Sequence, residues 1–177
     1  MSKQDKNINT KHMYVKTTVK IIGTIVLTVS LLLNLFTLVM PVVKYYGTSM
    51  SPTLEDGQIL IVSKLSEIES GDIIAFYYNN KVLVRRVAAV GNEQITVDVF
   101  GTVMVNGNEI EEPYIQNKTY GQCDVEFPFS VPSNTYFVLG DNREVAMDSR
   151  LEEIGTVAED RVIGKIVFSI HPFGIVK

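Results

Sequence analysis

The chain has 177 residues, of which 46% are hydrophobic and 20% charged, a composition typical of a folded protein with one modest domain plus appendages. This balance argues against large-scale disorder. Cys123 is the only cysteine, so an intramolecular disulfide is excluded. The two histidines and the cysteine lack the spacing of a zinc site, and we expect no metal and no cofactor.

The first element in chain order is an apolar run without charged residues, from Ile21 to Val43. Its length as a helix is about 34 Å, enough to cross a hydrocarbon core of about 30 Å. A cleavable signal peptide has a shorter apolar region and a small-x-small site, which residues 41–46 do not offer. We therefore predict a basic tail over 1–20, an uncleaved transmembrane helix over 21–43 and an outer domain over 44–177, rather than a signal peptide or a buried core helix.

Charge is distributed unequally on the two sides of this run. Five lysines and one aspartate precede it, whereas residues 44–177 contain 11 Lys and Arg against 19 Asp and Glu. Because positive charge flanking a first helix stays in the cytoplasm, we predict a single-pass plasma membrane protein with its C-terminal domain extracellular. The acidic domain disfavours nucleic acid as a partner. Tyr45 and Tyr46 follow the helix, and we expect both at the membrane interface.

The remainder predicts a mainly β domain with an antiparallel sheet, because short β-branched and apolar runs alternate with Gly, Asn and Asp. Asn79-Asn80 and Asn106-Gly107-Asn108 are hairpin turn signals. We expect residues 111–132 to form an excursion from the sheet and residues 149–160 a short helical or looped insertion. The predicted strands are 58–63, 72–78, 81–90, 94–100, 102–105, 136–139 and 162–170.

One segment after the helix suggests nucleophilic chemistry. Ser49 lies between Gly47, which permits an unusual backbone path, and Pro52, which fixes the chain. A serine hydroxyl needs an adjacent base and donors that stabilise an oxyanion. Taken alone, this segment is equally well explained as an inert loop.

Several further motifs accompany it in order, and together they resemble the bacterial type I signal peptidases, which are membrane-anchored Ser-Lys endopeptidases. The resemblance extends over nearly all of the outer domain. It rests on segments 49–54 (Ser-Met-Ser-Pro-Thr-Leu), 57–62, 71–76, 84–87 (Val-Arg-Arg-Val), 140–143 (Gly-Asp-Asn-Arg) and 147–150 (Met-Asp-Ser-Arg).

This resemblance implies that Ser49 is the nucleophile and that exported preproteins with A-x-A-like cleavage sites are the substrates. The scissile peptide would lie extended beside the strand that leads into Ser49. Met50 and Val84 fall at substrate-binding positions, and the apolar stretch around Met50 is expected to face the membrane lipid.

The sequence departs from the family pattern at two positions. Arg85 occupies the place of the general base lysine, and an arginine remains protonated at neutral pH. Ala146 occupies the place of a serine that would hold that lysine. Lys81 lies about 13 Å along the strand from Arg85 and is not a direct replacement. Three other lysines, Lys64, Lys118 and Lys165, are expected at the surface.

Asp141, Arg143, Asp148 and Arg150 are expected to form ion pairs that shape the site without transferring protons. The acidic group at Glu109, Glu111 and Glu112 is expected to be a solvated loop face.

Two functions remain open from the sequence. The first is a serine endopeptidase that removes signal peptides with an unorthodox base or very low activity. The second is a catalytically impaired homologue that acts as an accessory factor in pilus or surface-protein assembly, with pilin-like partners. Retention of Ser49 keeps the enzymatic interpretation open. The arginine at position 85 keeps the accessory-factor interpretation open.

Overall fold

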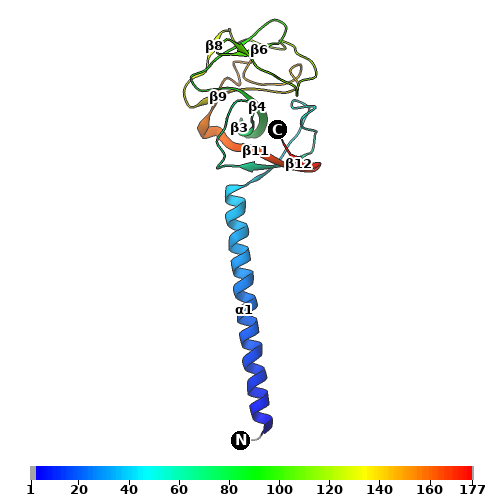
Figure 1. Cartoon of the computed structure of the whole chain (residues 1–177), viewed down its shortest axis with the longest axis vertical. Coiled ribbons are helices and arrows are strands. Elements are labelled where there is room, and N and C mark those ends of the chain that lie inside the picture. The colour runs from blue at the N-terminus through cyan, green and yellow to red at the C-terminus, as the bar shows by residue number, and fades with distance from the viewer. Residues whose placement is uncertain (1–2, 177) are drawn as a thin grey trace. The chain divides into compact units, whose positions relative to one another are not determined.

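The computed structural model describes residues 3–176, which form two compact units that divide between Val39 and Met40 (Figure 1). The first unit is a single helix, α1 (Lys3–Val39). Its stretch Met13–Val39 is long and apolar enough to cross a membrane, and its side chains are exposed over nearly all of its length. It is the one such helix among the described residues.

The helix boundaries differ from the predicted ones at both ends. The helix already begins in the lysine-rich segment and ends at Val39, four residues before the end of the apolar run. Pro41 explains the end, because proline has no N–H to donate and disfavours a helical residue before it. The chain then forms β1 (Val42–Lys44), so two residues of the predicted transmembrane segment belong to the sheet.

The second unit contains an eight-stranded sheet in the order β1-β2-β11-β3-β4-β9-β10, with β12 paired to β11. Every strand pairing in the described residues is antiparallel, which confirms the predicted fold class. The strands of this sheet that follow β1 are β2 (Ile59–Ser63), β3 (Ile73–Tyr78), β4 (Lys81–Val90), β9 (Thr135–Leu139), β10 (Val157–Ala158), β11 (Val162–Ile170) and β12 (Phe173–Ile175).

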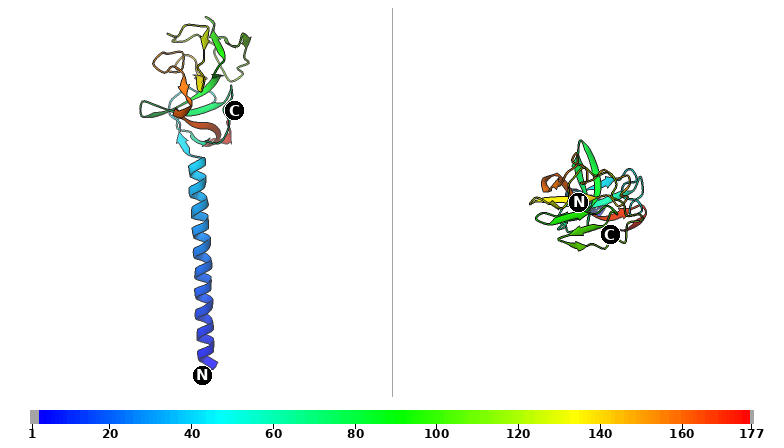
Figure 2. Two further views of the ribbon diagram at one scale, coloured as in Figure 1. Left: turned by 90° about the vertical axis from the view of Figure 1, so that its left-hand side faces the viewer. Right: turned by 90° about the horizontal axis from the view of Figure 1, so that it is seen from above.

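A smaller sheet lies in a different part of this unit, where β6 and β8 are separated from β11 and β12 (Figures 1 and 2). Its order is β7-β6-β5-β8. β5 ends earlier than expected because the carboxylate of Asp98 accepts hydrogen bonds from two backbone N–H groups of the following turn, 2.9 and 2.8 Å away. The strands are β5 (Gln94–Val97), β6 (Val103–Val105), β7 (Asn108–Glu109) and β8 (Phe129–Ser130).

The predicted turns are present in the form expected. Asn79 and Asn80 have φ of 43° and 59° between β3 and β4, and Asn106 and Gly107 have φ of 52° and 80° between β6 and β7. Residues 111–132 contain only β8 as regular structure, and residues 149–160 consist of turns, β10 and the start of a 3-10 helix, η1 (Glu159–Arg161).

β4 organises the functional region because it changes partner along its length. Residues 81–86 pair with β3, whereas residues 86–90 pair with β9. The loop between β1 and β2, which contains Ser49, and the loop after β9 are brought together by a hydrogen bond from the Asn142 N–H to the Ser49 carbonyl, 3.0 Å long.

Candidate functional site

The turn that carries Ser49 is held from both sides. Gly47 has φ of 98°, a conformation that favours glycine, and its N–H donates to the Asp56 carboxylate at 2.6 Å. Met50 is completely buried on the other side of Ser49. The Ser49 side chain itself is half-buried, so a peptide can reach it.

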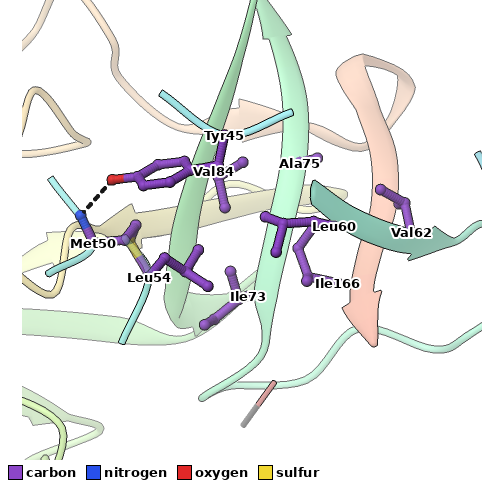
Figure 3. Close-up of a cluster of buried hydrophobic side chains, with 9 residues drawn as sticks. All are labelled: Tyr45, Met50, Leu54, Leu60, Val62, Ile73, Ala75, Val84 and Ile166. Carbon is purple, nitrogen blue, oxygen red and sulfur yellow. Dashed lines mark hydrogen bonds between the residues drawn. The ribbon is translucent and has the colours of Figure 1, made fainter. Parts of the chain in front are cut away.

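The described hydrogen-bond partner of the Ser49 hydroxyl is Tyr45. The two oxygens are 3.3 Å apart, and the Tyr45 oxygen also accepts a hydrogen bond of 2.9 Å from the Met50 N–H (Figure 3). Because that N–H donates to the phenol oxygen, the phenol proton is available to Ser49. Tyr45 is 3% exposed, so the expectation that it lies at a membrane interface is wrong, whereas Tyr46 is exposed.

Met50 and Val84 do not present their side chains outward. Both are buried in a cluster with Tyr45, Leu54 and side chains of the large sheet, as the close-up shows (Figure 3). The sheet residues of this cluster other than Val84 are Leu60, Val62, Ile73, Ala75 and Ile166. The expectation that Met50 faces lipid is wrong, because its side chain fills the core beneath the Ser49 turn.

Arg85 lies on β4 and is 5% exposed. Its Nε donates to the Met147 carbonyl at 2.9 Å and its Nη1 to the Val84 carbonyl at 2.6 Å. Burial lowers the pKa of Arg85, while Asp148 and Tyr45 act in the opposite direction. An arginine so anchored is a cation and a donor, not a proton acceptor.

None of the four other lysines weighed as a base lies in a position to replace it. Lys165 pairs with Asp72 at 2.7 Å, and Lys118 pairs with Glu109 at 2.9 Å. Lys64 and Lys81 are exposed. The exposed positions of Lys64 and Lys118 agree with the expectation from sequence, whereas Lys165 is half-buried.

Ala146 and Gly140 bring the loop after β9 close to the turn that carries Ser49. A Cβ on Gly140 would lie 2.3 Å from the Ala146 Cβ and 2.6 Å from the Ser49 carbonyl oxygen. Glycine is therefore required for this close approach. The buried methyl group of Ala146 offers no hydroxyl to hold a base.

Three buried ion pairs form the frame of the site. Arg150 is fully buried and donates to both carboxylate oxygens of Asp148 at 2.8 and 2.9 Å, and Asp148 also accepts from the Gly140 N–H at 2.9 Å. Arg143 pairs with Glu112. Glu112 is thus an internal partner, and its predicted place on a solvated loop face is wrong.

The third pair joins Arg86 to Asp141 through two hydrogen bonds of 2.8 and 2.7 Å. The Arg86 guanidinium also lies 3.7 Å from the centre of the Tyr114 ring. Asp141 accepts a further hydrogen bond from the Thr53 hydroxyl, four residues after Ser49. Burial raises the pKa of Tyr114, so the ring remains a neutral phenol over the Arg86 cation.

Sequence reasoning placed four of these ionic residues near the site but missed Arg86, Glu112 and Tyr45. Tyr45 offered one signal, a phenol four residues before a serine in a Gly-containing turn. Among the described residues, no group of three His, Cys, Asp or Glu side chains is arranged to hold a metal.

Comparison with known proteins gives consistent similarities. A family model described as "Signal peptidase, peptidase S26" matches residues 15–171. The chain is 37% identical over 139 residues to a signal peptidase I of Bacillus amyloliquefaciens, covering 72% of each chain. It is 35% identical over 147 residues to a signal peptidase IB of Staphylococcus aureus strain Mu50, covering 72% of this chain and 75% of the relative. A solved signal peptidase I of Enterococcus faecalis V583 is 28% identical, with a TM-score of 0.49 over 58% of this chain and 98% of that one.

Proposed function

Because the chain belongs to the signal peptidase family, peptidase S26, we propose that its outer domain binds exported preproteins through the segment around their cleavage site. The peptide lies extended beside Ser49, whose hydroxyl is half-buried at the end of a well-anchored turn. Buried Met50 and Val84 support the turn and β4 from below, and the peptide contacts their backbone.

The hydrogen bonding of Arg85 argues against rapid cleavage of a bound peptide. Its guanidinium donates to the Met147 and Val84 carbonyls, and it cannot accept the Ser49 proton. Loss of a general base typically costs about 10²- to 10⁴-fold in rate. Under this proposal the protein holds the peptide and hydrolyses it slowly or not at all, and it acts as an accessory factor for preproteins or pilin-like surface proteins.

A second function, signal peptide removal by a serine endopeptidase, is favoured by one contact. The Tyr45 oxygen is 3.3 Å from the Ser49 hydroxyl and already accepts the Met50 N–H at 2.9 Å. In this route the Tyr45 oxygen would take the proton of the Ser49 hydroxyl.

The membrane arrangement belongs to the same proposal. The helix over Met13–Val39 crosses the plasma membrane, and the lysine-rich segment before it stays in the cytoplasm. The outer domain then meets preproteins as they leave the membrane. A protease-protection assay on membrane vesicles tests this orientation, since the domain should be digested only from the extracellular side.

Cleavage of a model preprotein by the detergent-solubilised chain separates the two functions. Wild type is compared with Ser49→Ala and Tyr45→Phe, and the product's new N-terminus is sequenced. We expect wild type to match Ser49→Ala and both to retain the preprotein in a pull-down. Cleavage after a small-x-small site that disappears in both variants would instead establish the peptidase with Tyr45 as its base.

A further inference from the structure

Four arginines of the outer domain are buried, but they share only three buried acids. Arg86, Arg143 and Arg150 each have a carboxylate partner, whereas no described carboxylate lies within ion-pair distance of Arg85. Asp148, a carboxylate that acts electrostatically on Arg85, already binds Arg150 through both oxygens. The buried frame therefore carries one excess positive charge, and that charge interacts electrostatically with Tyr45, whose hydroxyl contacts Ser49.

An unpaired buried charge is costly, so buried charges in proteins usually have a partner of opposite sign. Both hydrogen bonds of Arg85 go to neutral carbonyls. Its Nη2 has no hydrogen-bond partner among the described residues, and this nitrogen is not sealed from solvent. The free end of this guanidinium is therefore accessible to an external anion.

The first half of β4 has a free edge at which a peptide that carries such an anion can bind. From Lys81 to Val84 this strand pairs with β3 on one side only, and β9 occupies the other side from Arg86 onward. An extended peptide can add to a free strand edge through backbone hydrogen bonds. A peptide parallel to β4 must end, or leave the sheet, at Arg85, because β9 blocks further pairing.

We infer that Arg85 is the receptor for the C-terminal carboxylate of an extended peptide that adds to the free edge of β4 and ends beside Ser49. The inference rests on the proposed peptide-binding function and specifies its ligand. The bound species has the form of a processed signal peptide, with a free carboxylate after its small-x-small residues. Arginine suits this task because its planar fork matches the two oxygens of a carboxylate.

Fluorescence anisotropy with the detergent-solubilised chain tests the inference, using N-terminally labelled peptides that end in Ala-x-Ala. The free acid is compared with the C-terminal amide, with an amide whose last residue is Asp, and with a longer peptide that spans the cleavage site. We expect the free acid to bind at least about tenfold more tightly than either amide, the ratio for one charge-assisted hydrogen bond. Arg85→Gln should remove that ratio, while Arg161→Gln, at a half-exposed arginine on η1, should keep it.

Each outcome has a distinct meaning. Equal binding of acid and amide by wild type overturns the carboxylate inference but leaves peptide binding intact, and this comparison needs no variant to fold. Equal binding of the acid and the Asp-ended amide overturns the inference that the site requires a C-terminal carboxylate, because an acidic side chain would then bind equally well. Failure of the spanning peptide to bind overturns the proposed function itself.

Discussion

Replacing Arg85 with lysine should convert the site into a working Ser-Lys pair. A lysine nitrogen would fall near the centre of the present guanidinium, beside Met147 and near Tyr45, whose hydroxyl contacts Ser49. The burial that lowers the pKa of Arg85 would also lower the pKa of a lysine at this position, because burial disfavours the charged form of either cation. A lysine with a lowered pKa provides a neutral amine that can accept the serine proton.

The expected gain follows from general base catalysis, which contributes about 10²- to 10⁴-fold. We expect Arg85→Lys to raise the cleavage rate by at least about 10²-fold, and Ala146→Ser to add to this by holding the amine. Lysine loses the hydrogen bonds to the Met147 and Val84 carbonyls, at a cost of about 1 kcal/mol each, which the domain should tolerate.

The assay is preprotein cleavage over a range of pH, with Ser49→Ala added to each variant as the control. The rate should rise as pH passes through the pKa of the new lysine and then level off, because only the neutral amine is active. The reasoning is refuted if the double variant with Ala146→Ser folds and binds peptide normally but cleaves no faster than wild type.

Three further changes test the frame of the site. Tyr45→Phe leaves a buried backbone N–H without its acceptor and should lower the free energy of unfolding by about 1–3 kcal/mol, measured by chemical denaturation. Asp141→Ala leaves a buried arginine without its carboxylate and should cost about 3–5 kcal/mol in the same assay; a loss under 1 kcal/mol would contradict the assigned pairing. Gly140→Ala should displace the Ser49 turn and abolish peptide binding, whereas Gly174→Ala, with open space around the added Cβ, should leave binding unchanged.

The main strands were predictable because their apolar runs and the turns between them are determined by residues that are close in sequence. The two Asn-containing turns fix β3 to β4 and β6 to β7 through positive φ angles that asparagine and glycine accept readily. Five strands of two or three residues were missed, namely β1, β7, β8, β10 and β12, whereas the three-residue β6 was predicted within 102–105. Segments this short carry too little periodicity, and they form because a longer neighbour offers hydrogen-bond partners.

The site was predictable in its residues but not in its contacts. The motifs place Ser49 and Arg85 together through resemblance, yet the pairing of Glu112 with Arg143 spans 31 positions and has no local signature. The burial of Tyr45 depends on β1, which the apolar run concealed within the predicted helix. Because this short strand was not predicted, the contact between the Tyr45 hydroxyl and Ser49 was not predicted either.

The charge balance explains why a single position separates the possible functions. The three paired arginines are neutralised within the frame, so the excess charge is confined to Arg85. Lysine there can lose its proton and serve as a base, whereas arginine keeps its charge and attracts a carboxylate. Arg85→Lys should consequently exchange one property for the other, with faster cleavage and weaker preference for the free acid over the amide. If the variant gained cleavage and kept the full acid preference, the carboxylate would be bound by a group other than residue 85.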